Sequence, residues 1–437
     1  MYNITSEIVW LLNLLLWNDK RGPIETRTLF KKNGLELQNK NVEKILKDKS
    51  RGYISYLRGE NPFSFPFKIY PEITYTPSPS KQFINNSWVE LNEEDKIKNM
   101  VFYKNELSDW QLSGMLKYRP IENIEERKDD GEDIIDEDQD VLLYDSSFNR
   151  EPLQISNILF PSPDDDNGYI RDAGFNKSFI KNINNTYTYQ DGLDNMDGSD
   201  NGFLHKDHID RYSIKFKNIM DNILTSKGIV FVFSQFITHG ILSFALTLEE
   251  NGFIKNDGNG NTSRLLNKDI HEDNRYCAVH KKYYGELEDY EKIAFKQAKY
   301  IYLDGTMKKK DIDILVKEAR SENNKYGEEV LVILGSNVVQ QGISFFNTRE
   351  VHIMDPWYHL NKMEQAVGRA IRRESHKNLP KNQNNVTVFL HIASLNSEYE
   401  SIRKDQDGDG ISDDWEQLNQ RNPADGKECR SRWSPYH

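Results

Sequence analysis

The second half of the chain contains short runs of consecutive aliphatic, β-branched and aromatic residues, at residues 229–233, 300–303, 330–334, 350–354 and 386–391. Apolar runs of this length are typical of strands that are buried on both faces. The stretches between most of them have apolar residues at helical spacing and predict helices over residues 213–228, 238–250, 285–299, 308–319 and 359–371. Strands that alternate with helices indicate βαβ units. Residues 206–403 are therefore predicted to form an α/β domain, a parallel sheet with helices on both faces.

The first half of the chain has a less regular pattern. Residues 1–80 predict a helical and loop region that begins with the apolar run Ile8–Trp17. This run is about half of the roughly 20 residues that a membrane span needs, so we expect a buried amphipathic helix and no membrane partner. Residues 81–205 predict an insert that is helical around 101–118 and rich in Asp, Asn, Gly and Ser near its end.

Charge is concentrated in two acidic stretches. The chain has a net charge of −12, but residues 121–140 contribute −9 and residues 405–416 contribute −6. The first stretch lacks an apolar face and predicts a solvated, disordered segment. The rest of the chain has a net charge of +3, so the acidic total does not exclude a nucleic-acid partner. The two cysteines form no disulfide framework, which is consistent with a reducing compartment.

Residues 365–372 contain the pattern QxxGRxxR, and the predicted helix 359–371 places it directly after a strand. Arg369 and Arg372 are three residues apart and would share one face of that helix. Two guanidinium groups there could stabilise the charge of a phosphoryl group in transfer. Gly368 would allow close approach of a neighbouring backbone or of a nucleotide. The alternative is an ordinary basic helix with surface ion pairs.

Polar residues follow two of the predicted strands. Ser234 and Gln235 come after the strand at 229–233, and Ser336 comes after the strand at 330–334, shortly before Gly342. Ligands of open parallel sheets bind at the carboxyl ends of the strands. Hydroxyl and amide groups at such positions can donate hydrogen bonds to phosphate groups.

This ordered set of motifs resembles the second RecA-like lobe of superfamily 2 helicases and Swi/Snf-type translocases. The resemblance implies that Arg372 is an arginine finger and Arg369 its companion. It assigns Gln365, Gly368 and Gly342 to nucleotide binding, and Ser234, Gln235 and Ser336 to contacts with the nucleic-acid backbone.

The strings LLNLLLWNDKRGPI, RGYISYLRGENPFSFP and REVHIMDPWYHLNKMEQAVGRAIRRESH are similar to those of D6/D11-type helicases of large cytoplasmic DNA viruses, in their giant-virus form. This resemblance implies a role linked to viral transcription, in the host cytoplasm (the viral factory) or in the virion. The implied partners are DNA or RNA, the viral RNA polymerase or a separate polypeptide that carries the first lobe. Gln341 stands where the family usually has Glu.

The sequence contains no GxxxxGK[ST] motif and no strand that ends in a DExH box. The look-alike Asp136–Gln139 lies within the acidic stretch, where no strand precedes it. ATP and Mg²⁺ would therefore be shared with a first lobe, and we expect this chain alone to be inactive. The alternative is a non-enzymatic relic that binds nucleic acid or a partner, or a calcium-binding interaction module.

The predicted tail domain, residues 404–437, contains carboxylates at the loop positions of a calcium site: Asp405, Asp407, Asp409, Asp413 and Glu416. The string resembles DxDGDGxxDxWE calcium repeats, and a merely acidic tail is the alternative. Cys277 and His280 have a spacing found in zinc sites, but no second pair of ligands follows nearby, and we do not predict zinc.

Overall fold

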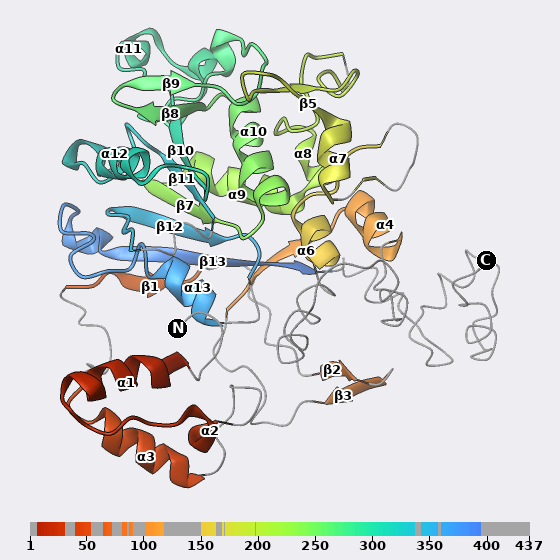
Figure 1. The fold of residues 1–437 in the computed structure, drawn as a ribbon. Coiled ribbons are helices and arrows are strands. Elements are labelled where there is room, and N and C mark those ends of the chain that lie inside the picture. The colour runs from red at the N-terminus through yellow and green to blue at the C-terminus, as the bar shows by residue number, and fades with distance from the viewer. Residues whose placement is uncertain are drawn as a thin grey trace, which may run out of the picture. The chain divides into compact units, whose positions relative to one another are not determined.

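The computed structural model describes residues 7–30, 40–53, 64–71, 81–84, 87–90, 101–117, 150–162, 168–169, 171–196, 198–336, 342–356 and 360–394. The chain divides into two compact units, residues 1–63 with 120–150 and residues 64–119 with 151–437 (Figure 1). The acidic stretch 121–140 and the tail from residue 404 lie outside the described residues, so disorder and calcium binding there stay predictions.

The first unit contains the helices α1 (Glu7–Asn18), α2 (Thr26–Leu29) and α3 (Lys40–Ser50). One stripe of α1, formed by Val9, Leu12 and Leu16, is buried against α2, α3 and the segment that joins α1 to α2. The other face is not covered within this unit, and Trp10 is 63% exposed. The predicted helix is thus present, but only one of its apolar stripes is buried. No helix in the described ranges is long and apolar enough to cross a membrane.

The second unit is built on one large sheet. In chain order its strands are β1 (Phe67–Ile69), β4 (Tyr103–Glu106), β7 (Ile229–Phe233), β8 (Ile254–Gly258), β9 (Asn261–Ser263), β10 (Lys299–Leu303), β11 (Val332–Gly335), β12 (Thr348–Ile353) and β13 (Asn385–Ser394). The spatial order is β1-β13-β12-β7-β11-β10-β8-β9, and β4 also pairs with β13. The pairing is parallel throughout except between β8 and β9. All five predicted strands are confirmed.

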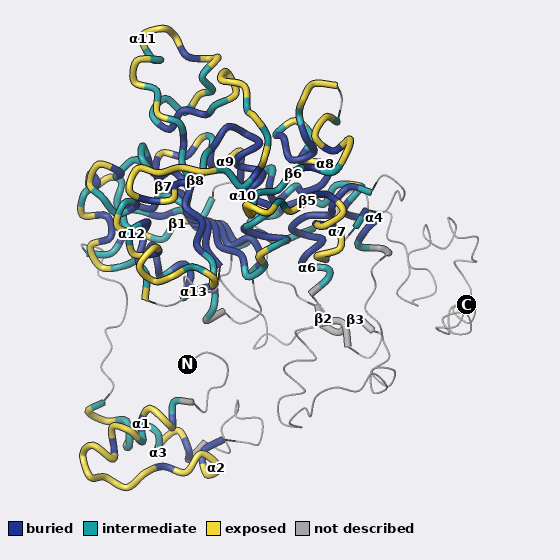
Figure 2. The backbone as a smooth tube through the Cα atoms, turned by 45° about the horizontal axis from the view of Figure 1, so that its top comes forward, coloured by how far each residue is buried: buried dark blue, intermediate teal, exposed yellow. Residues whose placement is uncertain are grey.

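Helices cover both faces of this sheet, because successive residues of each strand point to opposite sides. Val230 and Val232 of β7 pack with α9 (Ile214–Thr225) and α10 (Ser243–Glu250). Phe231 and Phe233 pack on the other side with α12 (Lys309–Ala319) and α13 (Leu360–Val367). Figure 2 shows the strands as the buried centre of this layered arrangement. Ser213 caps α9 by accepting a hydrogen bond from the Phe216 N–H.

Shorter elements complete the description. The remaining helices are α4 (Asp109–Lys117), α6 (Arg150–Asn157), α7 (Arg171–Ser178), α8 (Ile209–Tyr212), α11 (Asp289–Lys292), the π-helix η2 (Ile237–Leu242), and the 3-10 helices η3 (Glu272–Asn274), η4 (Tyr284–Glu286), η5 (Glu322–Asn324) and η7 (Lys381–Gln383). Two hairpins pair β2 (Lys81–Ile84) with β3 (Ser87–Glu90) and β5 (Phe179–Lys181) with β6 (Tyr187–Tyr189). The hairpin β5–β6 packs through aromatic residues such as Phe179, Tyr189 and Phe203.

The structure corrects several expectations about this unit. The helix expected around residues 101–118 is limited to α4, because residues 103–106 form β4 and pair with β13. The helix predicted over 285–299 is wrong, because only η4 and α11 are helical there and β10 begins at Lys299. The backbone near residue 298 pairs with a distant segment instead, since the Ala298 N–H donates to the Tyr276 oxygen at 2.8 Å. The sheet also extends beyond residues 206–403, because β1 and β4 from earlier in the chain both pair with β13.

Candidate functional site

The carboxyl ends of three neighbouring strands bring predicted site residues to one edge of the sheet. The register aligns Phe233 of β7 with Gly335 of β11 and with Ile353 of β12. Ser234 and Ser336 therefore follow adjacent strands at the same level. The sequence analysis placed these residues at strand ends, and the strand order makes them neighbours.

The two serines are buried at this edge. The Ser234 hydroxyl accepts a hydrogen bond from the Phe236 N–H at 3.1 Å and also bonds to the Asp355 carboxyl group. Ser336 is 3% exposed, and its N–H donates to the Leu303 oxygen at 3.2 Å. Both serines thus help to hold the strand ends together, and their contact with nucleic acid stays a prediction.

Asp355 is a site residue that the sequence analysis missed. Its Oδ2 accepts a hydrogen bond from the Gln235 N–H at 2.9 Å, and its Oδ1 lies 3.4 Å from the Asn157 amide nitrogen. Burial raises the pKa of Asp355 to about 6, although these hydrogen bonds and the charge of Lys215 act in the opposite direction. The signal was the string IMDP, in which an acid directly follows a buried strand.

Lys215 supplies the positive charge opposite Asp355. This side chain of α9 is fully buried, and its Nζ donates to Ser156 Oγ at 2.9 Å, to Asn157 Oδ1 at 3.0 Å and to the Met354 oxygen at 3.0 Å. Burial lowers the pKa of Lys215 to about 8, and the charge of Asp355 opposes that decrease. The Lys215–Asp355 network therefore joins α9 and α6 to the ends of β7 and β12.

The residues of the QxxGRxxR pattern lie partly beyond a helix. α13 ends at Val367, and residues 368–371 form turns, so the expectation that both arginines share a helical face is wrong. The reason is tertiary pairing. The Phe345 N–H donates to the Arg369 oxygen at 2.8 Å, and the Asn347 N–H donates to the Ser375 oxygen at 2.8 Å. These bonds use carbonyl groups of the segment that follows the helix.

Both arginines nevertheless contact the segment that follows Gly342. Gly342 itself has a φ of +73°. Arg369 is buried and its Nη1 donates to the Ile343 oxygen at 3.3 Å. Arg372 is half-buried; its Nε donates to the Gly368 oxygen at 3.0 Å and its Nη1 to Ser344 Oγ at 2.6 Å. The structure thus brings together Gly342, Gly368 and the two arginines.

Two amide side chains of the predicted site have unsatisfied polar atoms. Gln365 Oε1 and Gln235 Nε2 are buried, and neither has a hydrogen-bond partner among the described residues. A buried polar atom without a partner is costly unless a ligand or water satisfies it. One of these atoms is an acceptor and the other a donor, and their contacts with a ligand stay predictions.

A third arginine, Arg320, was also missed. It follows α12, and its Nε donates to the Ser344 oxygen at 2.6 Å. Its guanidinium carbon lies 5.4 Å from the centre of the Phe346 ring. No sequence signal marks Arg320, because a basic residue at the end of a helix is common.

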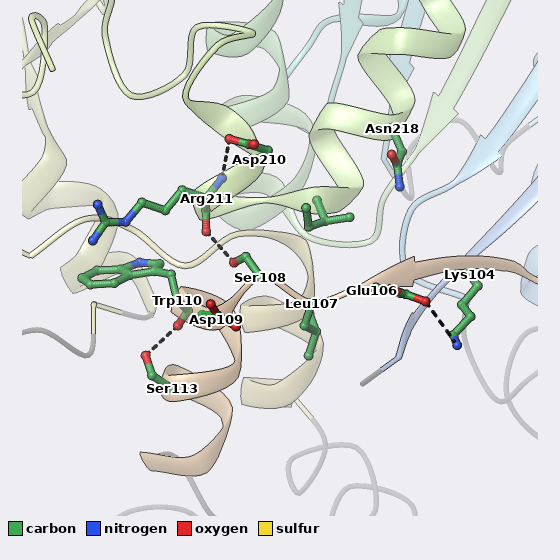
Figure 3. A pocket seen from close by; sticks show the side chains of 11 residues that line it. Lys104, Glu106, Leu107, Ser108, Asp109, Trp110, Ser113, Asp210, Arg211 and Asn218 are labelled. Atoms are coloured by element: carbon green, nitrogen blue, oxygen red, sulfur yellow. Dashed lines mark hydrogen bonds and ion pairs between the residues drawn. The ribbon is translucent and has the colours of Figure 1, made fainter. Parts of the chain in front are cut away.

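A separate pocket opens between β4, α4, α8 and α9 (Figure 3). The guanidinium carbon of Arg211 lies 5.0 Å from the centre of the Trp110 ring, and Ser108 Oγ donates to the Arg211 oxygen. Lys104 and Glu106 form an ion pair at 3.5 Å in the same lining. None of the site residues predicted from the sequence lines this pocket.

Cys277 Sγ lies 3.4 Å from His280 Nδ1. Across the part of the chain that the structure describes, no group of three or more His, Cys, Asp or Glu residues could hold a metal ion. This pair supplies two of the four ligands that a structural zinc site needs, and the absence of zinc stays a prediction.

Residues 259–374 match the family described as helicase conserved C-terminal domain. The matched range includes β10, β11, β12, α13 and all three arginines that contact residues 343–344. The parallel sheet with helices on both faces is the architecture of a RecA-like lobe, as the sequence analysis predicted.

Helicases of large DNA viruses are similar to this chain over much of its length. Two proteins of Acanthamoeba polyphaga mimivirus, each with the name "Putative ATP-dependent RNA helicase", are 25% identical over 400 residues and 24% identical over 421 residues. The matches cover 90% and 86% of this chain, but only 52% and 32% of those relatives. The chain thus spans about half the length of the first relative and about a third of the second.

A further relative is the "Termination factor NPH-I homolog" of African swine fever virus (isolate Tick/Malawi), which is 29% identical over 191 residues. That match covers 42% of this chain and 26% of the relative. The crystal structure of the C-terminal part of the Fun30 ATPase domain aligns with this chain at 13% identity and a TM-score of 0.25. The alignment covers 47% of this chain and 52% of the Fun30 chain. The fold assignment depends on the strand order and not on this alignment.

Proposed function

We propose that residues 206–403 act as the second RecA-like lobe of an ATP-dependent nucleic-acid helicase or translocase of a large DNA virus. The observation that carries the proposal is the placement of Arg369 and Arg372. Both lie within the range that matches the helicase C-terminal domain, and both donate hydrogen bonds to the segment after Gly342. A basic helix with surface ion pairs would not direct two guanidinium groups to one backbone segment.

The donors present suit a nucleoside triphosphate. Arg372 would contact the terminal phosphate, because guanidinium groups bind phosphate oxygens in a planar, bidentate geometry. Arg369, which is buried, would add a second positive charge beside Arg372. Gln365 Oε1 would accept a hydrogen bond from the ligand. ATP, when bound, supplies the phosphoryl group whose transfer drives the cycle. Magnesium ligands are not assigned, since the described residues contain no cluster of metal-binding side chains.

Nucleic acid would contact the strand-end edge. Gln235 Nε2 is a buried donor that has no partner within the described residues, and it could bind a phosphate oxygen. Its backbone N–H is held by Asp355, so the side chain is presented from a fixed position. Ser234 and Ser336 would shape this edge. Closure and opening against the first lobe would then couple hydrolysis to movement along the strand.

A role in viral transcription is part of the proposal, because the African swine fever virus relative is named as a termination factor. DNA or RNA, a first helicase lobe and the viral RNA polymerase would be the partners. The host cytoplasm or the virion would be the location.

An ATPase assay with a first lobe supplied as a separate polypeptide tests the proposal. The purified chain alone should release no phosphate above background, because its sequence has no GxxxxGK[ST] motif. Addition of a first lobe and nucleic acid should produce activity. Arg372→Ala should then lower the rate by about 10³–10⁵, the range measured for arginine fingers.

Arg373→Ala is the matched control, because Arg373 is exposed and, among the described residues, forms an ion pair with the neighbouring Glu374 alone, at 3.6 Å. Its rate should equal that of the wild type. Activity that is unchanged by both Arg369→Ala and Arg372→Ala would disprove the finger assignment. Robust turnover by the chain alone would show that it holds a nucleotide in another way.

A further inference from the structure

Two arginines from distant parts of the chain contact the same serine. Arg320, which follows α12, donates from Nε to the Ser344 oxygen at 2.6 Å. Arg372, which follows α13, donates from Nη1 to Ser344 Oγ at 2.6 Å. Both guanidinium groups are therefore hydrogen-bonded directly to Ser344. The sequence pattern QxxGRxxR contains Arg372 but not Arg320.

Most of the donors on these two side chains have no hydrogen-bond partner in the part of the chain that the structure describes. An arginine has five N–H donors. Arg320 uses its Nε, and Arg372 uses its Nε and one N–H of Nη1. Among the described residues neither side chain forms an ion pair with a carboxylate. The remaining N–H groups are half-buried and are available to an anion.

The two guanidinium groups also act on each other electrostatically. Burial lowers the pKa of Arg320, and the positive charge of Arg372 lowers it further. Asp313, an exposed residue of α12, opposes this effect. Two positive charges repel, and an oxyanion that binds both guanidinium groups would reduce the repulsion.

Two contacts restrict the guanidinium plane of Arg320. The first is the hydrogen bond from its Nε to the Ser344 oxygen, and the second is its position over the Phe346 ring. A side chain that is held at Nε keeps its Nη atoms free for a ligand. Pre-organised donors of this kind bind phosphate with little further loss of entropy.

We propose that Arg320 and Arg372 together bind the terminal phosphates of a nucleoside triphosphate. The proposal rests on the proposed function, since it adds a third arginine to the same nucleotide site. Arg320 would contact phosphate oxygens directly, and Ser344 would set the spacing of the two guanidinium groups. Arg320, directly after α12, and Arg372, in the segment that follows α13, would then contact the same ligand.

Modification of the wild-type chain by phenylglyoxal, an arginine reagent, tests the proposal without any substitution. The rate at each arginine is read by mass spectrometry of peptides, with and without tripolyphosphate or ATP. Both ligands should slow the modification of Arg320 and Arg372 at least several-fold. Arg373 is the internal control, because it is exposed and should react at the same rate throughout. An unchanged rate at Arg320 would overturn the proposal.

The source of the phosphate is decided by a parallel arm with a single-stranded oligonucleotide. Protection by ATP and tripolyphosphate but not by the oligonucleotide supports a nucleotide site. Protection of Arg320 by the oligonucleotide alone would overturn the assignment to a nucleotide.

Titration calorimetry with tripolyphosphate provides a second measurement. Arg320→Gln should weaken binding about 10- to 100-fold, the effect of one lost hydrogen bond to a charged group. Arg320→Lys keeps the charge without the planar donors and should weaken binding less. Arg373→Gln should leave the affinity unchanged. Equal affinity of the wild type and a folded Arg320→Gln variant would contradict the proposal.

Different results would contradict the role of Arg320 and the proposed helicase function. If the reconstituted ATPase requires Arg372 but is the same in a folded Arg320→Gln variant and the wild type, only the role of Arg320 is lost. If no ATPase appears with a first lobe, while phosphate still protects both arginines, the anion site stands and the helicase function is lost.

Discussion

Replacement of Lys215 by Met should destabilise the sheet domain strongly. The new side chain has a similar length but cannot donate, so three buried acceptors lose their hydrogen bonds, which measure 2.9, 3.0 and 3.0 Å. Each unsatisfied buried group costs about 1–3 kcal/mol. Asp355 also loses the nearby positive charge. Loss of one partner of a buried pair costs about 3–5 kcal/mol, and we expect a decrease of that size in the free energy of unfolding.

The pH dependence separates the charge effect from the loss of packing. Burial already raises the pKa of Asp355 to about 6 from an ordinary 3.8, and the charge of Lys215 limits that rise. Without Lys215 the folded-state pKa should be higher still. A raised folded pKa means that stability is greatest when the carboxyl group is protonated and is lost as pH rises. The loss of unfolding free energy caused by Lys215→Met should therefore be larger at a pH above about 6, where the Asp355 carboxyl group of the wild type is ionised, than at a pH below 3.8, where it is protonated.

Urea unfolding followed by circular dichroism measures both effects. Lys217→Met is the matched control, because Lys217 lies on the same helix and makes an exposed ion pair with Asp221. It should change stability by less than about 1 kcal/mol. The double variant Lys215→Met with Asp355→Asn should be less destabilised than the sum of its parts. A cost of Lys215→Met below about 1 kcal/mol, or one that does not vary with pH, would refute the reasoning.

Two more predictions concern the carboxylates of the tail and the buried carboxylate of Glu249. A peptide of residues 404–427 should bind Ca²⁺ weakly, with Kd on the order of 10⁻⁴–10⁻³ M. Trp415 fluorescence should report this binding, and a response that persists in Asp405→Asn with Asp409→Asn would leave only an acidic tail. Burial raises the pKa of Glu249 to about 7 from 4.5, so the wild-type free energy of unfolding should fall as pH rises across that interval, by up to about 3 kcal/mol. Glu249→Gln should reduce the slope in urea titrations, and an unchanged slope would contradict this.

The strands of the sheet domain could be predicted from the sequence because their burial requires runs of consecutive apolar residues. A strand covered on both faces must be apolar at successive positions, and all five residues of β7 are both apolar and buried. The positions of Ser234 and Ser336 at strand ends followed from the same runs. The QxxGRxxR pattern identified Arg369 and Arg372 without any knowledge of their neighbours.

Other features depend on contacts between residues that are distant in the sequence, and no local sequence pattern indicates them. α13 ends at Val367 because the backbone near Phe345 pairs with Arg369, a competition that helical spacing cannot show. The predicted helix over 285–299 failed for the same reason, since Ala298 pairs with Tyr276.

The strand order decided which site residues meet. β7 lies between β11 and β12, so Asp355 reaches Gln235 across 120 positions of the chain. Arg320 meets Ser344 because α12 packs in the same core cluster as Phe345, the residue after Ser344. The sequence by itself determined which residues were apolar enough to form the core and which carried the chemistry. Only the tertiary structure decided their neighbours, because side-chain pairing depends on the packing of whole elements and not on local spacing.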